Sequence, residues 1–282
     1  MKSRWGALFS SVDELAGTIV TAESGTAASL VEIFSSVQGE GPEVGRTTVF
    51  VRFGGCDLRC RWCDSPGTWR PSSSCRVEVA PGAARFSEFP NPIAAEQVAE
   101  HVERLATQPS TWISLTGGEP LLQPVALEAI VDQLVSRGRK VYLETHGLHG
   151  QALERVVDRI DLVSMDWKLA SDVRWAPGIE PPAGEGFDDA HQRFLRIALA
   201  AKSVYVKVVV TPSTRDEELD AMLDRIAEVS PRVPLVLQPV TPTGGVKAAP
   251  DADQLLAWLA RAEARLPDVR LIPQTHPIYG VL

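Results

Sequence analysis

The residues with the clearest chemical potential are three cysteines in one short segment. Cys56, Cys60 and Cys63 are separated by three and then two residues. At this spacing, three thiolates can point into one small volume if the backbone loops around it. Iron–sulfur clusters are usually held by four cysteines, so a set of three leaves one iron open to another ligand. The segment therefore predicts an iron–sulfur site with one open coordination position.

Two other interpretations of these cysteines stay open at this point. One is a structural zinc site with Cys75 as fourth ligand, although such sites usually combine two tight Cys-x-x-Cys pairs and the chain has no second pair. The other is three free buried thiols, which the tight spacing disfavours. A disulfide framework is disfavoured too, because all four cysteines fall between residues 56 and 75.

The elements that must position this segment form a repeating pattern. Short apolar runs rich in Val, Leu and Ile predict strands that are covered on both faces. The cysteine segment directly follows one of these runs and the pair Gly54-Gly55. The predicted strands are 48–53, 112–116, 140–144, 161–166, 204–210, 235–240 and 269–273.

Apolar stripes at helical spacing predict helices between these strands. Asn91 and Pro92 are expected to begin the first helix, and Thr214 with Glu217 to form a capping box on the third. The predicted helices are 92–106, 124–137, 214–229 and 251–266, and the Pro-, Gly- and Ser-rich stretches 70–91 and 171–187 are predicted to be loops.

Strands that alternate with helices predict an α/β fold with a mostly parallel sheet, built as a full or partial barrel. Catalytic residues are then expected at the C-terminal ends of the strands. We expect residues 30–282 to form a single domain. Residues 1–29 are rich in Ser, Thr, Ala and Gly and predict a weakly ordered N-terminal extension.

The composition limits the class of protein. The chain has 282 residues, with 28 basic against 36 acidic residues and a net charge of −8, which argues against a domain that mainly grips nucleic acid. No apolar run reaches the roughly 18 residues of a membrane span. The early apolar stretch is broken by Asp13 and Glu14, so it makes a poor signal peptide. We expect a cytoplasmic protein that binds neither nucleic acid nor membrane.

The chain resembles the radical S-adenosylmethionine (SAM) enzymes, whose signature is Cys-x3-Cys-x2-Cys after a strand. Flanking motifs narrow the resemblance to the 7-carboxy-7-deazaguanine synthases, over about residues 31–282. Each motif alone is weak, but their order along the chain is specific. The motifs are Phe34–Pro42 (FSSVQGEGP), Phe50–Cys56 (FVRFGGC), Trp62–Asp64 (WCD), Ser114–Leu121 (SLTGGEPL), Glu144–Gly147 (ETHG), Ser164–Leu169 (SMDWKL), Gln238–Pro242 (QPVTP) and Pro273–His276 (PQTH).

The resemblance implies a partial (β/α)6-type radical SAM barrel and a role for each matching residue. Cys56, Cys60 and Cys63 would ligate a [4Fe-4S] cluster, and SAM would chelate the open iron. Ser65 would bind Mg²⁺ where the family commonly has Thr, because it also offers a hydroxyl oxygen. The SAM-binding residues would be Gly117, Gly118, Glu119, Glu144, Ser164, Lys168, Gln238, Pro239, Val240 and Thr241. The substrate-binding residues would be Val37, Gln38, Gly39, Arg52, Thr116, His276 and the terminal carboxylate of Leu282.

Several of these residues also have a plainer interpretation. Ser65 could cap the turn into Pro66-Gly67, and Arg52 could be a surface arginine on its strand. The faces of that strand distinguish the two, because Val51 and Phe53 must point away from Arg52. His146 stands where the family usually has Asn, so that SAM contact is expected to differ in detail.

The implied reaction is a radical ring contraction of 6-carboxy-5,6,7,8-tetrahydropterin to 7-carboxy-7-deazaguanine with loss of ammonia. This is a carbon–nitrogen lyase reaction of 7-deazapurine (queuosine-type) biosynthesis. The resemblance also implies a homodimer and an electron donor such as flavodoxin. The alternatives are another radical SAM enzyme, such as a glycyl-radical activase that acts on a protein, and a zinc-binding interaction module.

Overall fold

The computed structural model describes residues 25–180 and 186–281. Its centre is a ten-stranded sheet in the order β14-β13-β12-β10-β9-β8-β3-β2-β5-β6. The strands from β3 to β14 in this order are all parallel, which confirms the α/β class with a mostly parallel sheet. The strands are β2 (Leu30–Val37), β3 (Thr47–Phe53), β5 (Ser74–Glu78), β6 (Phe86–Pro90), β8 (Trp112–Gly117), β9 (Lys140–Thr145), β10 (Leu162–Asp166), β12 (Val204–Val210), β13 (Leu235–Pro239) and β14 (Val269–Leu271).

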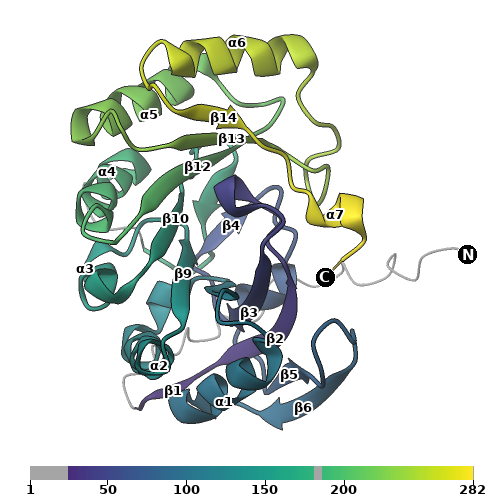
Figure 1. The fold of residues 1–282 in the computed structure, drawn as a ribbon. Coiled ribbons are helices and arrows are strands. Elements are labelled where there is room, and N and C mark those ends of the chain that lie inside the picture. Colours follow the sequence, from purple (N-terminus) through teal and green to yellow (C-terminus); the bar gives the residue numbers. More distant parts are fainter. Residues whose placement is uncertain (1–24, 181–185, 282) are drawn as a thin grey trace, which may run out of the picture.

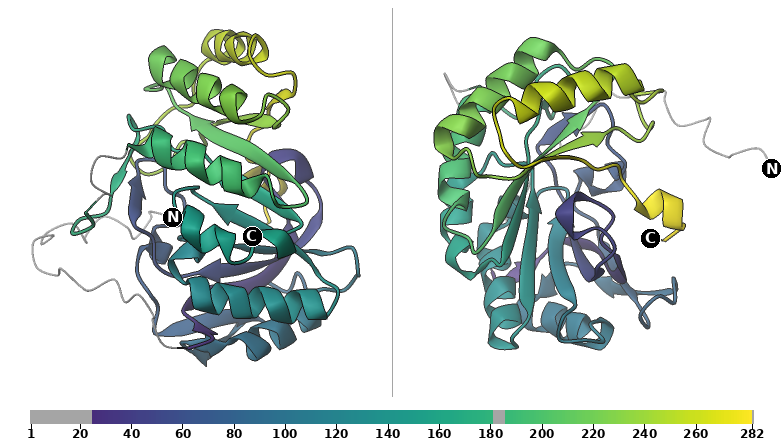
Figure 2. Two further views of the ribbon diagram at one scale, coloured as in Figure 1. Left: turned by 90° about the vertical axis from the view of Figure 1, so that its left-hand side faces the viewer. Right: turned by 45° about the horizontal axis from the view of Figure 1, so that its top comes forward.

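The sheet curves but does not close. Strands β14 and β6 stand at its two ends and do not pair with each other, so the barrel is partial, as expected. The helices α1 to α6 follow the outer face of the sheet, whereas the short α7 lies on the opposite, concave side (Figure 1 and Figure 2). The helices are α1 (Ala95–Leu105), α2 (Pro124–Ser136), α3 (Gly150–Glu154), α4 (Phe187–Ala198), α5 (Asp216–Val229), α6 (Ala252–Glu263) and α7 (His276–Tyr279).

Short elements complete the chain. Two-stranded sheets join β1 (Ala27–Ala28) to β7 (Ile93–Ala94) and β4 (Leu58–Cys60) to β11 (Val173–Trp175). Part of the expected N-terminal extension, residues 25–29, thus includes a paired strand, and residues 1–24 lie outside the described residues. The 3-10 helices are η1 (Gly41–Glu43), η2 (Pro66–Trp69), η3 (Pro120–Leu122) and η4 (Val157–Arg159).

The core lies between the sheet and the outer helices. It buries one side of each strand against the apolar stripes of the helices, and it includes Val51 and Phe53 of β3 and Val98 and Val102 of α1. Both β3 side chains are fully buried, while Arg52 between them points to the concave side and lines a cavity there. This confirms the prediction that Val51 and Phe53 point to the opposite face of the strand from Arg52.

Two predicted helix starts are wrong. Helix α1 begins at Ala95 rather than at residue 92, because Asn91 instead bonds the backbone of Leu30 and Ser72 with its side chain. Helix α5 begins at Asp216 without the predicted box, because the Thr214 hydroxyl accepts from the backbone N–H of Thr211. Polar residues near a helix start can bond other backbone groups when the fold brings them closer.

The two stretches predicted to be loops are only partly so. Residues 70–91 contain the antiparallel pair β5 and β6, which widens the sheet beyond β2. Residues 171–187 contain β11 and the first residue of α4, a helix missing from the sequence prediction. Among the described residues no helix is long and apolar enough to cross a membrane.

Candidate active site on the concave side of the sheet

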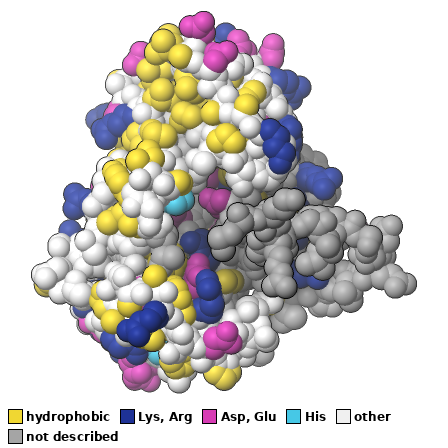
Figure 3. Space-filling model, turned by 90° about the vertical axis from the view of Figure 1, so that its right-hand side faces the viewer, with side chains coloured by type: hydrophobic (Ala, Val, Ile, Leu, Met, Phe, Trp, Pro, Cys, Tyr) yellow, Lys and Arg dark blue, Asp and Glu magenta, His cyan; other side chains and the backbone are white. Residues whose placement is uncertain are grey.

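A cavity of about 550 Å³ opens on the concave side of the sheet, at the C-terminal ends of its parallel strands. Figure 3 shows this side as a hollowed face with charged side chains of both signs and a histidine in the hollow. Of the predicted site residues, all line this cavity except three: Glu119 and Pro239, which do not, and Leu282, which lies outside the described residues. Those that line it are Val37, Gln38, Gly39, Arg52, Cys56, Cys60, Cys63, Ser65, Thr116, Gly117, Gly118, Glu144, Ser164, Lys168, Gln238, Val240, Thr241 and His276.

The cysteine segment is held in place mainly by backbone contacts from distant parts of the chain. Strand β4 pairs with β11, and the backbone N–H of Ala176 donates to the carbonyl of Asp57. Arg61 is anchored to Asp172 and Gly245. Its backbone N–H donates to the carbonyl of Asp172, its carbonyl accepts from the N–H of Gly245, and its guanidinium lies 2.8 Å from the Asp172 carboxylate. The loop prediction for 171–187 therefore missed the segment that braces the cysteines.

The cysteines are chemically suited to hold a metal cluster. Cys56, Cys60 and Cys63 are free, partly buried and line the same cavity, whereas Cys75 is buried in the hydrophobic core. Burial raises the pKa of the Cys56 thiol to about 12 and that of Cys60 to about 11. Metals bind the thiolate, so iron must displace these protons as it binds.

Gly117 and Gly118 let two strand ends come together. A Cβ added to Gly118 would lie 2.0 Å from the carbonyl oxygen of Gly55, and one on Gly117 would lie 2.5 Å from the backbone of Phe53. The two glycines thus bring the end of β8 against the start of the cysteine loop. The sequence analysis assigned both glycines to SAM binding, and glycine does let a backbone approach a ligand closely. The structure shows that the close approach is also toward the chain itself.

Glu119 is fully buried beneath the cavity rather than in its wall. Its carboxylate accepts from the backbone N–H of Leu121, the backbone N–H of His146 and the hydroxyl of Thr145, at 2.8–3.0 Å. It caps η3 and ties it to the end of β9. These contacts account for a glutamate here without a ligand.

A buried charged network lies at the floor of the cavity. The Lys207 ammonium is 2.9 Å from both Glu40 and Asp166, and Lys168 is 2.7 Å from Asp166. Burial alone would lower the pKa of Lys207, but the two carboxylates hold it well above its ordinary value. Despite burial, the same contacts keep the pKa values of Glu40 and Asp166 below their ordinary values. Lys168 also lies over the Trp62 ring, 4.4 Å from its centroid.

Two arginines share one carboxylate at the β2–β5 side of the cavity. Arg52 donates through Nε to Glu32 at 2.9 Å, and Arg76 of β5 donates to the other oxygen of Glu32. Both arginines line the cavity. Because Glu32 takes only the Nε of Arg52, its two terminal nitrogens have no hydrogen-bond partner among the described residues and remain available to an anion.

Gln38 lines the cavity, but its polar groups are already used within the chain. Its amide nitrogen donates to Glu144 at 3.1 Å and its amide oxygen accepts from the backbone N–H of Glu40. Glu144 also accepts from the Ser114 hydroxyl through the same oxygen, Oε1. Burial and the nearby charge of Glu40 raise the pKa of Glu144 above its ordinary value. In the described chain, Glu144 Oε2 is left for a ligand.

The C-terminal segment closes one side of the cavity. The carbonyl of Gly39 accepts from the backbone and the hydroxyl of Thr275, and a Cβ on Gly39 would lie 2.7 Å from Nδ1 of His276. Gln274 donates to Glu40 and to Asp64. Segments more than 200 residues apart in sequence therefore meet at the cavity wall.

Ser65 lies at the start of η2 and its side chain makes no capping hydrogen bond. The turn is fixed instead by Thr68, whose N–H and hydroxyl both donate to the carbonyl of Ser65. The capping interpretation of Ser65 is therefore wrong. Ser65 and Asp64 both line the cavity, and hydroxyl and carboxylate oxygens are hard ligands that suit Mg²⁺.

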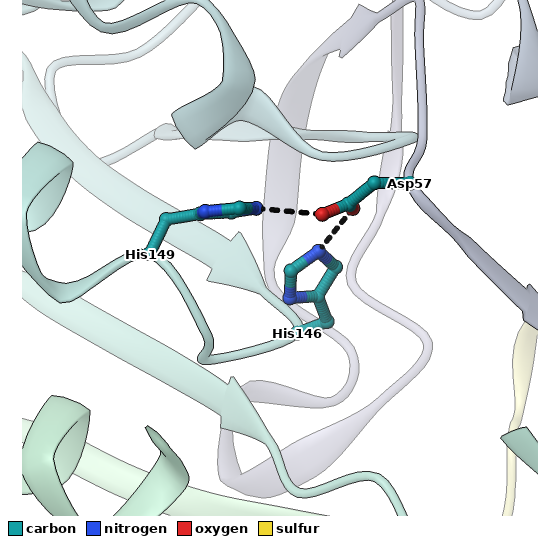
Figure 4. Close-up of side chains that lie close together, drawn as sticks. All are labelled: Asp57, His146 and His149. Atoms are coloured by element: carbon teal, nitrogen blue, oxygen red, sulfur yellow. Dashed lines mark hydrogen bonds and ion pairs between the residues drawn. The ribbon is translucent and has the colours of Figure 1, made fainter. Parts of the chain in front are cut away.

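Asp57, inside the cysteine segment, meets two histidines that follow β9. His146 Nε2 lies 2.8 Å from one oxygen of Asp57, and His149 Nε2 lies 2.9 Å from the other (Figure 4). Although burial opposes a charge on His146, the carboxylates of Glu119 and Asp57 raise its pKa. His191 of α4 supports the same loop by donating to the carbonyl of His146.

The cavity has unused polar capacity that fits a polar ligand. Four of its residues carry a buried polar side-chain atom without a hydrogen-bond partner among the described residues. These atoms are Trp62 Nε1, His146 Nδ1, Asp166 Oδ1 and Gln238 Oε1. Since buried polar groups are normally paired, the four atoms together indicate a bound molecule with several hydrogen-bonding groups.

The sequence reasoning missed several cavity residues. Lys207 had a signal, because it is the one charged residue in the apolar strand Val204–Val210 (VYVKVVV). Glu40 and Asp166 stood inside recognised motifs but were given no role. Arg76 and Trp69 had no local signal, because only the widening of the sheet by β5 and the turn of η2 bring them to the cavity.

Comparisons with known proteins agree with this geometry. Residues 50–226 match the model of the radical SAM superfamily. The chain is 39% identical over 262 residues to the 7-carboxy-7-deazaguanine synthase of Geobacter sulfurreducens, covering 90% of this chain and 98% of that protein. It is 34% identical over 263 residues to the enzyme of the same name from Methanothermobacter thermautotrophicus, with the same coverage. The crystal structure of QueE from Escherichia coli shares the fold, with a TM-score of 0.57 at 21% identity over 89% of this chain and 96% of that one.

Proposed function

Because this chain belongs to the 7-carboxy-7-deazaguanine synthases of the radical SAM superfamily, we propose a role for each polar group in its cavity. The enzyme contracts the ring of 6-carboxy-5,6,7,8-tetrahydropterin to 7-carboxy-7-deazaguanine with loss of ammonia. When bound, the [4Fe-4S] cluster and SAM supply the 5′-deoxyadenosyl radical that begins this reaction. The protein's own task is to bind, orient and shield the reactants.

The assignment of roles rests on one observation: the candidate cluster ligands and the candidate substrate-binding residues line the same cavity. The three cysteines line it together with Arg52 and the C-terminal segment around His276. A cluster site and a site for an anionic substrate are thereby combined in a single space. We assign Cys56, Cys60 and Cys63 to the cluster.

SAM would be held by the ends of the strands that follow the cysteine loop. The contributing residues are Gly117, Gly118, Glu144, Ser164, Lys168, Gln238, Val240 and Thr241, and the unpartnered atoms of His146 and Gln238 add hydrogen-bonding capacity. The free oxygen of Glu144 can accept from a hydroxyl of the bound molecule. The contacts of Glu119 support a positioning role under this loop.

The substrate would be held on the β2–β3 side of the cavity. Arg52 presents two terminal nitrogens that no described residue binds, and a guanidinium forms paired hydrogen bonds with a carboxylate. Glu32 fixes the direction of this group through Nε. Val37, Gln38, Gly39, Thr116 and His276 would complete the wall, with Ser65 and Asp64 as oxygen ligands for Mg²⁺.

Three further proposals concern the setting of the enzyme. We infer a cytoplasmic homodimer whose residues 30–282 form a single domain and which takes electrons from a donor such as flavodoxin. The family resemblance supports these proposals. The cluster must be reduced before SAM can be cleaved, so the enzyme needs an electron donor.

The direct test is conversion of the pterin by the purified, anaerobically reconstituted protein. With SAM and a chemical reductant, we expect 7-carboxy-7-deazaguanine by mass spectrometry, while the amount of SAM stays constant. The Cys60→Ala protein, which lacks one cluster ligand, is the matched control and should form no product. Cleavage of SAM without any pterin conversion would show that the substrate assignment is wrong.

A further inference from the structure

The carboxylate of Asp57 and the Nε2 atoms of His146 and His149 have no role in the ring contraction proposed above. His149 does not line the cavity, and the three side chains point toward one another from two segments of the chain (Figure 4). One ligand atom from each lies within 4.8 Å of the others. We propose that these three residues form a further metal site, separate from the cluster cysteines and from the Mg²⁺ ligands, for a divalent metal such as Zn²⁺.

The donor set selects the class of ion. Two imidazole nitrogens and one carboxylate are typical of Zn²⁺ and of Fe²⁺, Co²⁺ or Ni²⁺. Mg²⁺ prefers an all-oxygen shell, so it would choose the Ser65 side of the cavity instead. The two sites therefore differ in ligand chemistry as well as in position.

The distances between the three side chains allow an ion to bind after small side-chain movements. The two imidazole nitrogens now lie 2.8 and 2.9 Å from the oxygens of Asp57, which are hydrogen-bond separations. Tetrahedral bonds of about 2.1 Å place neighbouring ligand atoms about 3.4 Å apart. Each nitrogen–oxygen pair would have to open by roughly half an ångström, within the reach of a side-chain torsion.

The charge around the cluster also favours a cation. The carboxylates of Asp57 and Glu119 are both buried, and Glu119 Oε2 lies 3.3 Å from His146 Nε2. Two buried carboxylates place negative charge in a poorly solvated part of the protein, which is costly without a positive partner. A divalent ion bound at the nitrogens would balance it.

An ion can reach the proposed site from solvent on the side of His149. The side chain of His149 is 28% exposed, whereas those of Asp57 and His146 are almost fully buried. Three protein ligands leave at least one coordination position for solvent on the exposed side. The bound ion would cross-link the cysteine loop to the loop after β9, the segment that also contributes His146 to the cavity.

The experiment measures zinc bound to the holoenzyme, so that the cysteines are already occupied by iron. Reconstituted protein is incubated with Zn²⁺, desalted over a weak chelator, and analysed for zinc content and by zinc X-ray absorption. We expect one zinc per chain with a nitrogen and oxygen shell near 2.0–2.1 Å and no sulfur near 2.3 Å. His149→Gln should weaken zinc binding at least tenfold. The control is His276→Gln, which should leave zinc binding unchanged because His276 lines the cavity but is not one of the three proposed ligands.

The outcomes separate clearly. Three results would each overturn the site: holoenzyme that retains no zinc, bound zinc with a sulfur shell, or equal zinc binding by His149→Gln. The three side chains would then be joined by hydrogen bonds alone. His146→Asn is the second variant if His149→Gln fails to fold, and iron content with circular dichroism checks the fold of each. Because zinc binding is read without turnover, a zinc-free protein that forms product overturns this site alone, and a zinc-binding protein without product overturns only the proposed function.

Discussion

At the scale of single residues, the four cysteines divide into three cavity residues and one core residue. Cys60→Ala should abolish cluster binding, because it removes one of three ligands that share the cavity. Cys75→Ala should keep a full iron load, because its thiol is packed in the core away from the cavity. Iron content after anaerobic reconstitution is the measurement. A normal iron load in the Cys60→Ala protein would contradict the cluster assignment.

Arg52 permits a test that separates the substrate from SAM. Lysine keeps the charge of Arg52 but loses the planar fork and the Nε that Glu32 now holds. We expect Arg52→Lys to weaken substrate binding by about 1.5–3 kcal/mol, roughly 10- to 100-fold in Kd. Substrate Kd and SAM cleavage without substrate are measured separately. If SAM binding is lost while substrate binding survives, Arg52 has been assigned to the wrong ligand.

For Ser65, the structure separates the proposed metal role from a capping role. Its hydroxyl caps nothing, so Ser65→Ala should leave the melting temperature unchanged. If the hydroxyl binds Mg²⁺, the same variant should lose most of the increase in turnover on adding Mg²⁺. Ser65→Thr, which keeps the hydroxyl, should retain it. A Mg²⁺ titration of Ser65→Ala that matches the natural protein would remove the metal role.

At the scale of elements, the decisive contact is the close approach of β8 to the cysteine loop. Gly118 allows it, because a Cβ there would overlap the carbonyl of Gly55. Gly118→Ala should therefore push the SAM strand end away from the cysteine loop, destabilise the protein by about 1–3 kcal/mol and reduce its iron load. The melting temperature and the iron content measure both effects.

Gly67→Ala is the matched control for this prediction. Gly67 lies on η2 at the same cavity, but a Cβ on it would meet nothing within 4 Å. We expect a change below about 0.5 kcal/mol and a normal iron load. Equal destabilisation by both substitutions would show that close packing at Gly118 is not the reason for its glycine.

Element boundaries were predicted well where burial repeats locally and poorly where pairing is distant. The parallel strands were found within one or two residues, because each is an apolar run between two covered faces. The pair β5–β6 and strand β11 lie among Pro, Gly and Ser and were predicted as loops. Strands β5 and β6 pair in a local hairpin that these residue types obscured, whereas β5 and β11 also pair with β2 and β4, about 40 and 110 residues away along the chain. No local periodicity reports such pairings.

At the scale of the whole molecule, exposed apolar side chains near the C-terminus bear on assembly. Ile278 and Tyr279 of α7 are 73% and 54% exposed, and Val281 follows them. Neighbouring exposed apolar side chains of this kind commonly mark an interface. We predict that the protein sediments at close to twice its chain mass of 30.6 kDa. Sedimentation equilibrium over a range of concentrations tests this, and a mass of one chain throughout would contradict the homodimer.

The sequence by itself determined the chemistry and the class of fold. The cysteine spacing, the strand-end motifs and the alternation of apolar runs are all local patterns, and one chain segment is enough to display each. They were sufficient to identify most of the residues that line the cavity. They were also sufficient to place Arg52 on the face opposite Val51 and Phe53.

Only the tertiary structure decided which polar groups face a ligand and which serve the chain. Glu119 stands in a recognised motif, yet it is fully buried and bonded to η3 and the end of β9. Lys207 stands out as the one charged residue of its apolar strand, yet only the fold shows that it joins Glu40 and Asp166 at the cavity floor. The physical reason is that a buried charge is tolerated only beside a partner. In this protein those partners come from segments tens to more than a hundred residues away, which only folding brings together.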